Sequence, residues 1–355
     1  MSPRPTGSSR APALLALALA AAGCATARPQ KIAWPAPPAT ERIRFVRTIS
    51  GGMDLEKGFA RFWRKLARLE QPSHLYHPLG VAVSPEGDLV AVSDQGHARL
   101  FIFDLAANLL HTVDREGLGE APAGVAVHDG QVWVAVPQRK IALAYARDGR
   151  PLRAIELDDC ERPLGLAIDG PRGLLYVSDV SSPQGDGHTV HVHELASGKH
   201  ARKLGSKGHG QGELFFPTFL ALRPDGGLYV ADTMNARVQE FDLDGKFVRQ
   251  FGERGDRFGQ FDKPKGVALD TFGNLYVVDS FFAAVQIFNP DAKLLLFFGG
   301  PGDSAGFLAN PAGIAIDAQN RIYVANGLNY RVDVYQLVNT SPQDSRPSAG
   351  AIAGR

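Results

Sequence analysis

The chain has 355 residues, of which 44% are hydrophobic and 21% charged, with a formal net charge of +1. This hydrophobic content is sufficient for a buried core, and the balanced charge gives no long-range field that would favour nucleic acid as a partner. The 39 glycines and 24 prolines predict many tight turns. Together these features are typical of a globular β protein.

The N-terminal segment predicts a signal peptide at residues 1–23. Arg4 and Arg10 form a positive region ahead of the apolar run "APALLALALAAA" at 11–22. A helix of about twelve residues is roughly 18 Å long, which is too short for a bilayer core of roughly 30 Å. The segment therefore predicts export rather than a membrane span.

The two cysteines have different surroundings in the sequence. "AAGC" ends at Cys24 and resembles the bacterial lipobox, in which the cysteine becomes the first mature residue and carries a lipid anchor. An ordinary signal peptide with a stray cysteine is the alternative. In the lipoprotein family an Asp after the cysteine favours inner-membrane retention. Ala25 stands there, so the resemblance implies the outer membrane, on its periplasmic or surface face.

If Cys24 is acylated, Cys160 has no partner for an intramolecular disulfide. Zinc sites built on cysteine pairs and c-type haem attachment are excluded by the cysteine count. The sequence predicts no cofactor and no metal.

A tether precedes the main domain, which we place at 41–338, and a helical insertion within that domain precedes its first blade. Residues 24–40 are rich in Pro and Ala and predict an extended tether. Residues 54–70 predict an amphipathic helix with Asp54 as N-cap, because their apolar residues have spacings of 4, 3, 4 and 3. The apolar stripe comprises Leu55, Phe59, Phe62, Leu66 and Leu69, and the opposite face carries Lys57, Arg61, Arg64, Lys65 and Arg68.

This helix has two interpretations. It packs on one end of the domain, which we favour, or it lies on the membrane or in a groove of a partner.

From residue 77 the chain repeats itself. A clear copy is "KPKGVALDTFGNLYVVDSFFAAVQIFNPDAKLLLFFG" from Lys263, and each copy contains four short apolar runs separated by turn residues. The marker prolines of the six copies are Pro78, Pro122, Pro163, Pro217, Pro264 and Pro311. Their spacings are 44, 41, 54, 47 and 47, and an insertion at 180–189 explains the long third spacing. Six copies of four strands predict an all-β, six-bladed β-propeller.

The repeat resembles the NHL repeat over residues 77–337. The resemblance rests on a Pro-x-Gly-(Ile/Val)-Ala opening, a Tyr-Val-Ala-Asp second strand and an Asn-x-Arg-Val lead into the third strand. It is strong in three copies and loose in the second. Together with the lipobox resemblance at Cys24, it implies a bacterial, lipid-anchored NHL-type propeller.

The sixth copy lacks a fourth strand, because "RVDVYQLV" is followed by a small, polar tail at 339–355 that predicts disorder. The missing strand matches residues 43–49 at the other end of the domain, where "RFVRTISGG" is similar to "KFVRQFGERG" in the fourth copy. We expect this N-terminal strand to close the last blade and remove its open edge.

A set of polar residues recurs at equivalent positions of the copies. Recurrence around a ring favours a structural role over catalysis, for example the binding of turn amides at the hairpin between the second and third strands. The acidic position holds Val136 in the second copy and Asn326 in the sixth, and Ala284 replaces the arginine in the fifth. The structural set comprises Asp94, Arg99, Asp179, Asp232, Asn235, Arg237, Asp279, Asn329 and Arg331.

The residues on both sides of the marker prolines are expected at the mouth of the central channel. They include one His and one Asn and no carboxylate, whereas a divalent ion needs three or four protein ligands. Arg162, Lys263 and Lys265 are ordinary solvated loop residues, which we favour, or they form a face that binds an anionic ligand or an acidic partner surface. The candidate binding rim comprises His77, Arg162, Thr218, Lys263, Lys265 and Asn310.

His188, His191 and His193 cluster in the third copy. Strand alternation places His191 and His193 on one face, so the pair is a weak metal site or, as we favour, part of a solvated strand.

No nucleophile motif such as G-x-S-x-G is present. The sequence therefore favours a non-catalytic scaffold in the cell envelope, which binds a protein or an anionic ligand. The alternative is a channel-centred lyase or hydrolase, resembling peptidyl-amidoglycolate lyases, which use histidines and zinc, or gluconolactonase-like enzymes, which use Glu, Asn and Asp around calcium or zinc.

Overall fold

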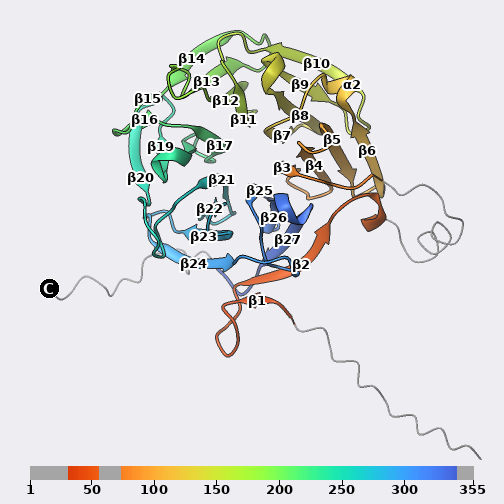
Figure 1. Cartoon of the computed structure of the whole chain (residues 1–355), viewed down its shortest axis with the longest axis vertical. Helices are drawn as coiled ribbons and strands as arrows, with labels where there is room; N and C mark the ends of the chain where they lie inside the picture. The colour runs from red at the N-terminus through yellow and green to blue at the C-terminus, as the bar shows by residue number, and fades with distance from the viewer. Residues whose placement is uncertain (1–30, 56–72, 342–355) are drawn as a thin grey trace, which may run out of the picture. The chain divides into compact units, whose positions relative to one another are not determined.

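The computed structural model describes residues 31–55 and 73–341. Its compact unit, Ile32–Arg355, places six antiparallel sheets around a central axis (Figure 1). We number these sheets as blades 1 to 6 in chain order, and we letter their strands a to d from the axis outward. The predicted six-bladed propeller is confirmed.

Each of the first five blades is a four-stranded meander in chain order. Blade 1 contains β3 (Pro78–Val83), β4 (Leu89–Asp94), β5 (Arg99–Asp104) and β6 (Leu109–Val113). Blade 2 contains β7 (Val125–His128), β8 (Gln131–Val136), β9 (Ile141–Tyr145) and β10 (Pro151–Glu156). Blade 3 contains β11 (Pro163–Asp169), β12 (Leu174–Asp179), β13 (Thr189–Glu194) and β14 (His200–Leu204).

The second half of the ring follows the same plan. Blade 4 contains β17 (Pro217–Leu222), β18 (Leu228–Asp232), β19 (Arg237–Phe241) and β20 (Phe247–Phe251). Blade 5 contains β21 (Pro264–Leu269), β22 (Leu275–Asp279), β23 (Ala284–Phe288) and β24 (Leu294–Gly299). Blade 6 contains β25 (Pro311–Ile316), β26 (Arg321–Asn326), β27 (Arg331–Leu337), β2 (Ile43–Ile49) and β1 (Ala33–Trp34).

Short elements connect the strands. They are the two-residue strands β15 (Ser206–Lys207) and β16 (Glu213–Leu214), the helix α2 (Arg115–Leu118), and the single turns η1 (Gly52–Asp54), η2 (Pro137–Arg139), η3 (Thr233–Asn235) and η4 (Gly327–Asn329). The last three form the b–c turns of blades 2, 4 and 6. Within the described residues, no helix is long and apolar enough to cross a membrane.

The hydrophobic core lies between neighbouring blades rather than in one place. One cluster joins Tyr276 and Val285 of blade 5 to Ile322 of blade 6, and another joins Val90 of blade 1 to Val332 of blade 6. The b strands are covered on both faces, which explains why β4 and β18 are buried along their whole length. The outer d strands instead alternate, as in β20, because one of their faces meets solvent.

The Pro-x-Gly opening of the repeat packs the inner strands against one another. A Cβ added at Gly165 would lie 2.3 Å from the Thr218 carbonyl oxygen, and one at Gly266 would lie 2.3 Å from that of Ala312. The glycine is therefore needed for close approach of neighbouring blades. The equivalent approaches elsewhere are Gly80 to Ala123, Gly124 to Leu164, and Gly313 to Leu79, which joins blade 6 to blade 1.

Blade 4 departs from this pattern, because Phe219 replaces the glycine. There the Thr218 hydroxyl contacts Thr233 Oγ1 at 2.8 Å and donates to the Lys265 carbonyl oxygen at 2.9 Å. Thr233 Oγ1 in turn donates to the Pro264 carbonyl oxygen at 2.6 Å. Two threonine hydroxyls thus join blades 4 and 5 where the glycine is missing.

The N-terminal strand closes blade 6 as expected. β2 pairs with β27 in antiparallel register, from Ile43 opposite Leu337 to Ile49 opposite Val332. Ile43 and Ile49 are buried, and Phe45 contacts Tyr335 edge to face at 5.7 Å. The closure removes the edge that β27 would otherwise expose.

The closing sheet extends beyond the prediction at both ends. Within the predicted tether, β1 pairs with β2, and Trp34 contacts Phe298 and Tyr335 at ring-centroid distances of 5.9 and 5.8 Å. At the start of the predicted disordered tail, Asn339 Nδ2 donates to the Glu41 carbonyl oxygen at 3.0 Å. Both ends of the described chain are therefore part of blade 6.

Candidate functional site

The recurring acidic residues bind backbone amides at the start of their own blade. In blades 1, 3 and 5 the fully buried carboxylates of Asp94, Asp179 and Asp279 accept the N–H groups of the two residues that precede the first strand. The contacts are Asp94 with Tyr76 N (2.6 Å) and His77 N (2.9 Å), Asp179 with Glu161 N (2.9 Å) and Arg162 N (2.6 Å), and Asp279 with Asp262 N (2.8 Å) and Lys263 N (3.2 Å).

The b–c turn amides expected as partners are bound as well in two blades. Asp94 accepts from His97 N at 2.8 Å, and Asp279 accepts from Phe281 N at 2.9 Å. These carboxylates therefore hold the b–c turn and the start of strand a together.

Asp232 is the centre of the largest of these networks. Its Oδ1 accepts from Phe215 N at 2.7 Å, and its Oδ2 accepts from Asn235 Nδ2, Arg237 Nε and Gln239 Nε2 at 2.8, 2.8 and 3.0 Å. Burial raises the pKa of Asp232, and the hydrogen bonds oppose that shift. These four partners all belong to blade 4 and the loop before it, so the carboxylate of Asp232 has a structural role.

The recurring arginines differ in their contacts. Arg237 also donates to the Gly210 and Glu213 carbonyl oxygens at 2.6 and 2.9 Å. Arg331 donates to Asp333 Oδ1 at 2.9 Å and to loop carbonyl oxygens, and Asn329 Nδ2 donates to the Gly302 carbonyl oxygen at 2.9 Å. Arg99 lies opposite Asp94 in the β4–β5 register, but its guanidinium makes no hydrogen bond within residues 31–55 and 73–341.

The candidate rim divides into exposed and structural residues. Arg162 is exposed, and His77 and Lys263 are half-buried. Thr218 is buried and serves the joint between blades 4 and 5. The Thr218 hydroxyl already has two partners, Thr233 Oγ1 and the Lys265 carbonyl oxygen.

The three predicted cations come from two blades and have different surroundings. Lys263 Nζ lies 3.3 Å from Met234 Sδ, and Lys265 Nζ donates to Asn310 Oδ1 at 3.3 Å. Burial lowers the pKa of Lys265, and Asp279 opposes this effect. Arg162 lies at the start of blade 3 and the two lysines at the start of blade 5, with blade 4 between them along the chain.

The b–c face carries exposed apolar side chains that the sequence analysis missed. Met234, Phe281 and Leu328 stand two residues after the recurring Asp or Asn of blades 4, 5 and 6, and they are 38, 68 and 53% exposed. Tyr330 and Tyr76 extend this row to blade 1 and stack at 5.1 Å with an interplanar angle of 3°. We call these five residues the apolar arc.

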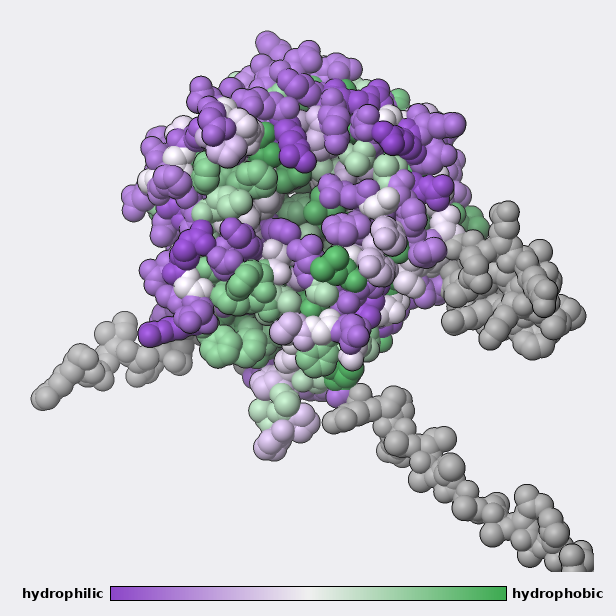
Figure 2. Space-filling model, in the orientation of Figure 1, coloured by the Kyte–Doolittle hydropathy of each residue, from purple (hydrophilic) through white to green (hydrophobic). Residues whose placement is uncertain are grey.

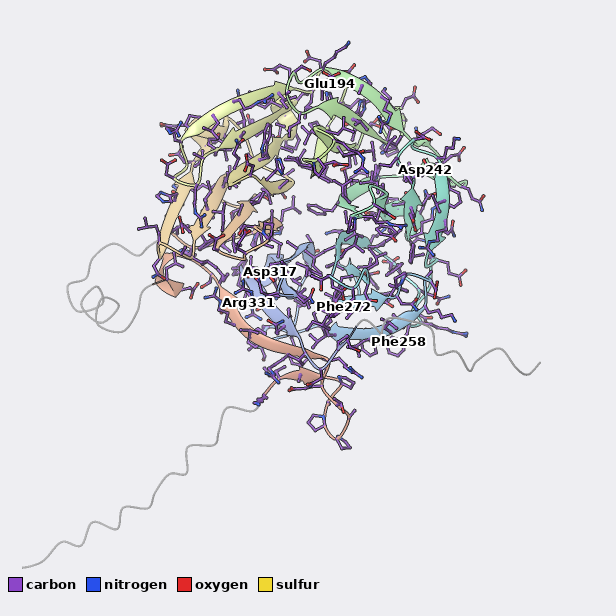
Figure 3. The ribbon with its side chains drawn as sticks, turned by 180° about the vertical axis from the view of Figure 1, so that it is seen from behind. Glu194, Asp242, Phe258, Phe272, Asp317 and Arg331 are labelled. Carbon is purple, nitrogen blue, oxygen red and sulfur yellow. The ribbon has the colours of Figure 1, made fainter. Side chains whose placement is uncertain are left out.

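The arc lies on one side of the ring. Figure 2 shows patches of hydrophobic surface over blades 4 to 6, interrupted by hydrophilic residues. Figure 3, from behind, labels Phe272 and Asp317 in the a–b hairpins of blades 5 and 6. The a–b turn precedes strand b and the b–c turn follows it, so the two turns lie at opposite ends of that strand. The arc therefore belongs to the b–c face.

The histidine cluster of blade 3 is not a solvated strand, so that expectation was wrong. His188, His191 and His193 are 0, 0 and 1% exposed. Strand β13 is the third strand of its blade, and neighbouring blades cover both of its faces. Burial lowers the pKa of His188 and His193.

Cys160 belongs to the same buried region. It lies between β10 and β11 within the apolar cluster that joins blades 2 and 3, and burial raises the pKa of its thiol. Cys160, His191 and His193 each place a potential ligand atom within 4.8 Å of the others. Nothing in the spacing of Cys160 along the sequence points to the histidines, so this group is not predictable from the sequence.

The predicted helix at 54–70 lies mostly outside the described residues. Asp54 is the last residue of η1, and its Oδ2 accepts from Ser50 Oγ and Gly51 N at 2.9 Å. The described part of its environment therefore shows Asp54 binding residues that precede it.

The fold defines the class of protein as a six-bladed β-propeller. No family model matches the chain, and no curated protein matches it in sequence. Among solved structures, the chain is similar to a protein of unknown function from Bacteroides thetaiotaomicron VPI-5482, with a TM-score of 0.61 and 18% identity over 83% of this chain and 75% of that one.

Two other similar structures have named functions. One is a streptogramin B lyase, with a TM-score of 0.55 and 13% identity over 74% of this chain and 94% of that one. The other is a chain in a nidogen/laminin complex, with a TM-score of 0.55 and 18% identity over 72% of this chain and 89% of that one. At these identities the likeness shows the fold alone.

Proposed function

We propose that this chain is an NHL-type, lipid-anchored propeller of the bacterial cell envelope that binds a protein partner through its b–c face. The observation that carries the proposal is the apolar arc. Met234, Phe281 and Leu328 occupy equivalent positions in three consecutive blades, and each is exposed. Scattered exposed hydrophobic residues need no explanation, but a row of them on one face is typical of an interaction site.

The polar groups around the arc indicate the chemistry of the partner. Lys263 contacts Met234 and is the cation of this border, whereas Arg254, which donates to the Met234 carbonyl oxygen at 2.7 Å, is paired with Asp262 at 2.8 Å. An apolar centre with a cationic border is complementary to a protein surface on which apolar side chains are flanked by carboxylates. Membrane attachment through Cys24 and placement in the outer membrane belong to the same proposal and rest on the sequence.

The alternative of a channel-centred lyase or hydrolase has the fold of the streptogramin B lyase in its favour. The residues flanking the marker prolines supply one His, one Asn and no carboxylate. Lys265 and Asn310 bind each other, and Thr218 is buried. Binding is therefore the better supported function for the mouth and the b–c face.

The experiment compares partner capture from native membranes by the wild type and by a double variant, the arc variant, which carries both Phe281→Ser and Leu328→Ser. Both side chains are largely exposed, so we expect an unchanged melting temperature and at least a tenfold loss of affinity, since central interface residues typically contribute about 2 kcal/mol or more. The control is Phe258→Ser, because Phe258 is 69% exposed but stacks on Phe297 of the outer strand β24 (Figure 3).

A second arm tests the cationic border. Lys263→Glu should weaken capture of the same partner, and added salt should weaken capture by the wild type. Capture that is unaffected by the arc variant, or is lost equally in Phe258→Ser, would refute the b–c face as the binding surface.

A further inference from the structure

Two buried imidazoles in blade 3 have ring nitrogens without a partner. His191 Nε2 and His193 Nε2 make no hydrogen bond to any residue that the structure describes, although the two histidines are 0 and 1% exposed. A buried polar atom without a partner costs about 1–3 kcal/mol. Such atoms need an explanation, and an absent ligand is one.

The other nitrogen of each ring indicates which atom is free to bind. His193 Nδ1 lies 3.1 Å from the Gly198 carbonyl oxygen, which can only accept, so the proton of the neutral ring is on Nδ1. His193 Nε2 therefore presents a lone pair. His191 Nδ1 lies 3.3 Å from His200 Nε2, which leaves His191 Nε2 as its free atom. Donation of Nδ1–H to a neighbour is the usual arrangement of a metal-binding histidine.

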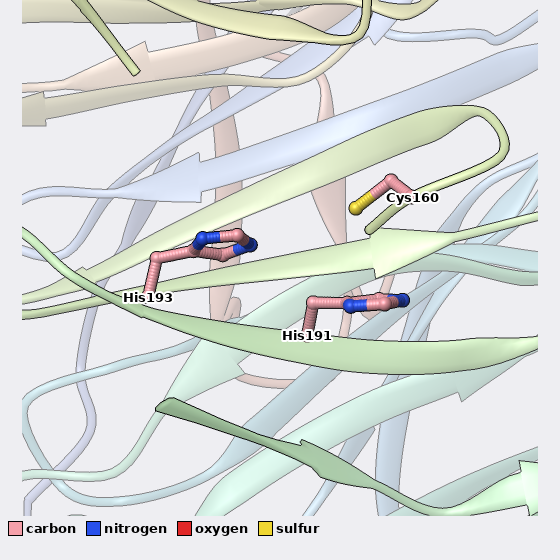
Figure 4. A group of neighbouring side chains, drawn as sticks. All are labelled: Cys160, His191 and His193. Carbon is pink, nitrogen blue, oxygen red and sulfur yellow. The ribbon is translucent and has the colours of Figure 1, made fainter. Parts of the chain in front are cut away.

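Cys160 completes the group. Figure 4 shows both rings extending in the same direction from β13, with the Cys160 sulfur reaching toward the same space. One ligand atom from each residue lies within 4.8 Å of the others. A thiol carries one proton and can satisfy one acceptor, so Cys160 alone cannot pair both imidazole nitrogens.

We propose that Cys160, His191 and His193 form a buried mononuclear copper site. One thiolate and two imidazoles are the trigonal ligand set of protein copper centres. Zinc instead takes four ligands in structural sites. When Cu(I) binds, a Cu–S bond replaces the S–H bond, the proton leaves to solvent, and no electron is transferred. The ion and the thiolate then have no net charge, which suits the apolar surroundings of Cys160.

His200 connects this site to the surface. It is half-buried and packs against His191 and His193 at a ring-centroid distance of 5.3 Å in each case. The two ligands thus lie one side chain below solvent. Asp179 Oδ2 lies 3.6 Å from His191 Nε2, but this carboxylate already binds the Glu161 and Arg162 amides through its two oxygens.

The test uses the full chain with Cys24→Ala, so that Cys160 is the sole cysteine. Cu(I) is added without oxygen, and its affinity is measured by competition with a chelator of known affinity. We expect one copper per chain, and a loss of affinity of more than about 100-fold in Cys160→Ser and in His193→Gln, because even outer contacts of a ligand contribute about 10–100-fold. An added one-electron oxidant, which takes one electron from each Cu(I), should give a visible Cu(II)–thiolate absorption band that Cys160→Ser lacks.

The matched control is His188→Gln. His188 is equally buried and also has an unpaired Nε2, but it does not belong to the group. It should bind copper as the parent chain does. If Cys160→Ser does not fold, X-ray absorption of the loaded parent chain decides, because the site requires one sulfur and two nitrogen ligands. The proposal would be overturned if the chain bound no copper, or if it bound one equivalent of zinc but no copper. It would also be overturned by a metal with no sulfur ligand, or by a folded Cys160→Ser chain that binds copper with the affinity of the parent chain.

Discussion

Removal of the closing strand should destabilise the whole propeller. A truncation that begins at Gly51 lacks β2 and leaves β27 as an open edge. Ile43 and Ile49 are 0 and 1% exposed, and each fully buried side chain of this type contributes about 1.5–3 kcal/mol. Their loss therefore costs about 3–6 kcal/mol, before the ladder hydrogen bonds and the Phe45–Tyr335 contact are counted.

This loss is large against the stability of a folded domain, which is about 5–15 kcal/mol. The assay is urea unfolding of three truncations that begin at Ile32, Thr40 and Gly51. The truncation at Thr40 loses β1 and the contacts of Trp34, and aromatic pairs contribute about 0.5–1.5 kcal/mol each. The unfolding midpoints should fall in that order, with the largest step at Gly51. Equal midpoints for the truncations at Thr40 and Gly51 would show that β2 does not stabilise the ring.

Three further changes test other parts of the structure. Asp232→Ala breaks a buried ion pair with Arg237 and should lower the free energy of unfolding by about 3–5 kcal/mol in urea titrations, whereas wild-type stability would mean that the network is not structural. Gly266→Ala places a Cβ 2.3 Å from the Ala312 carbonyl oxygen and should cost about 1–3 kcal/mol in the same assay, and an unchanged midpoint would show that neighbouring inner strands can separate freely. Cys24→Ala should release the protein from the membrane fraction or leave it unprocessed, and unchanged fractionation with a mature N-terminus elsewhere would exclude the lipobox.

The fold could be predicted because the same strand-and-turn pattern occurs six times in the sequence. Six copies of one pattern average out the ambiguity of any single strand, and the missing strand of the sixth copy has a visible match at 43–49. The short pair of β1 with β2 could not be predicted, since a two-residue strand leaves no pattern. Its stability comes from the packing of Trp34 on Phe298 and Tyr335, which lie far away in the sequence.

The environment of the histidines could not be predicted from alternation. In β13 polar and apolar residues alternate, which usually indicates one solvated face. In a propeller, however, both faces of an inner strand meet neighbouring blades, so the polar residues of β13 are buried as well. Cys160 joins them from the connection between blades 2 and 3, a contact that depends on how two sheets stack.

The apolar arc has a signal in the sequence, because Met234, Phe281 and Leu328 occupy one column of the aligned copies. Apolar residues in a turn can be buried or exposed, and only the structure distinguishes these outcomes. The exposed fractions here show that the column faces solvent.

The pairing of β2 with β27 also determines when folding of the ring can be completed. The hydrogen bond from Asn339 to Glu41 spans 298 residues of sequence, so the strand that is synthesised first obtains its partner last. Contacts of such separation are slow to form, because a long loop must close before any of them is gained. Until then Ile43, Phe45 and Ile49 lack their native cover, and an unpaired apolar strand is prone to aggregation. Completion of the ring therefore depends on how long the first strand stays unpaired before the last blade is available.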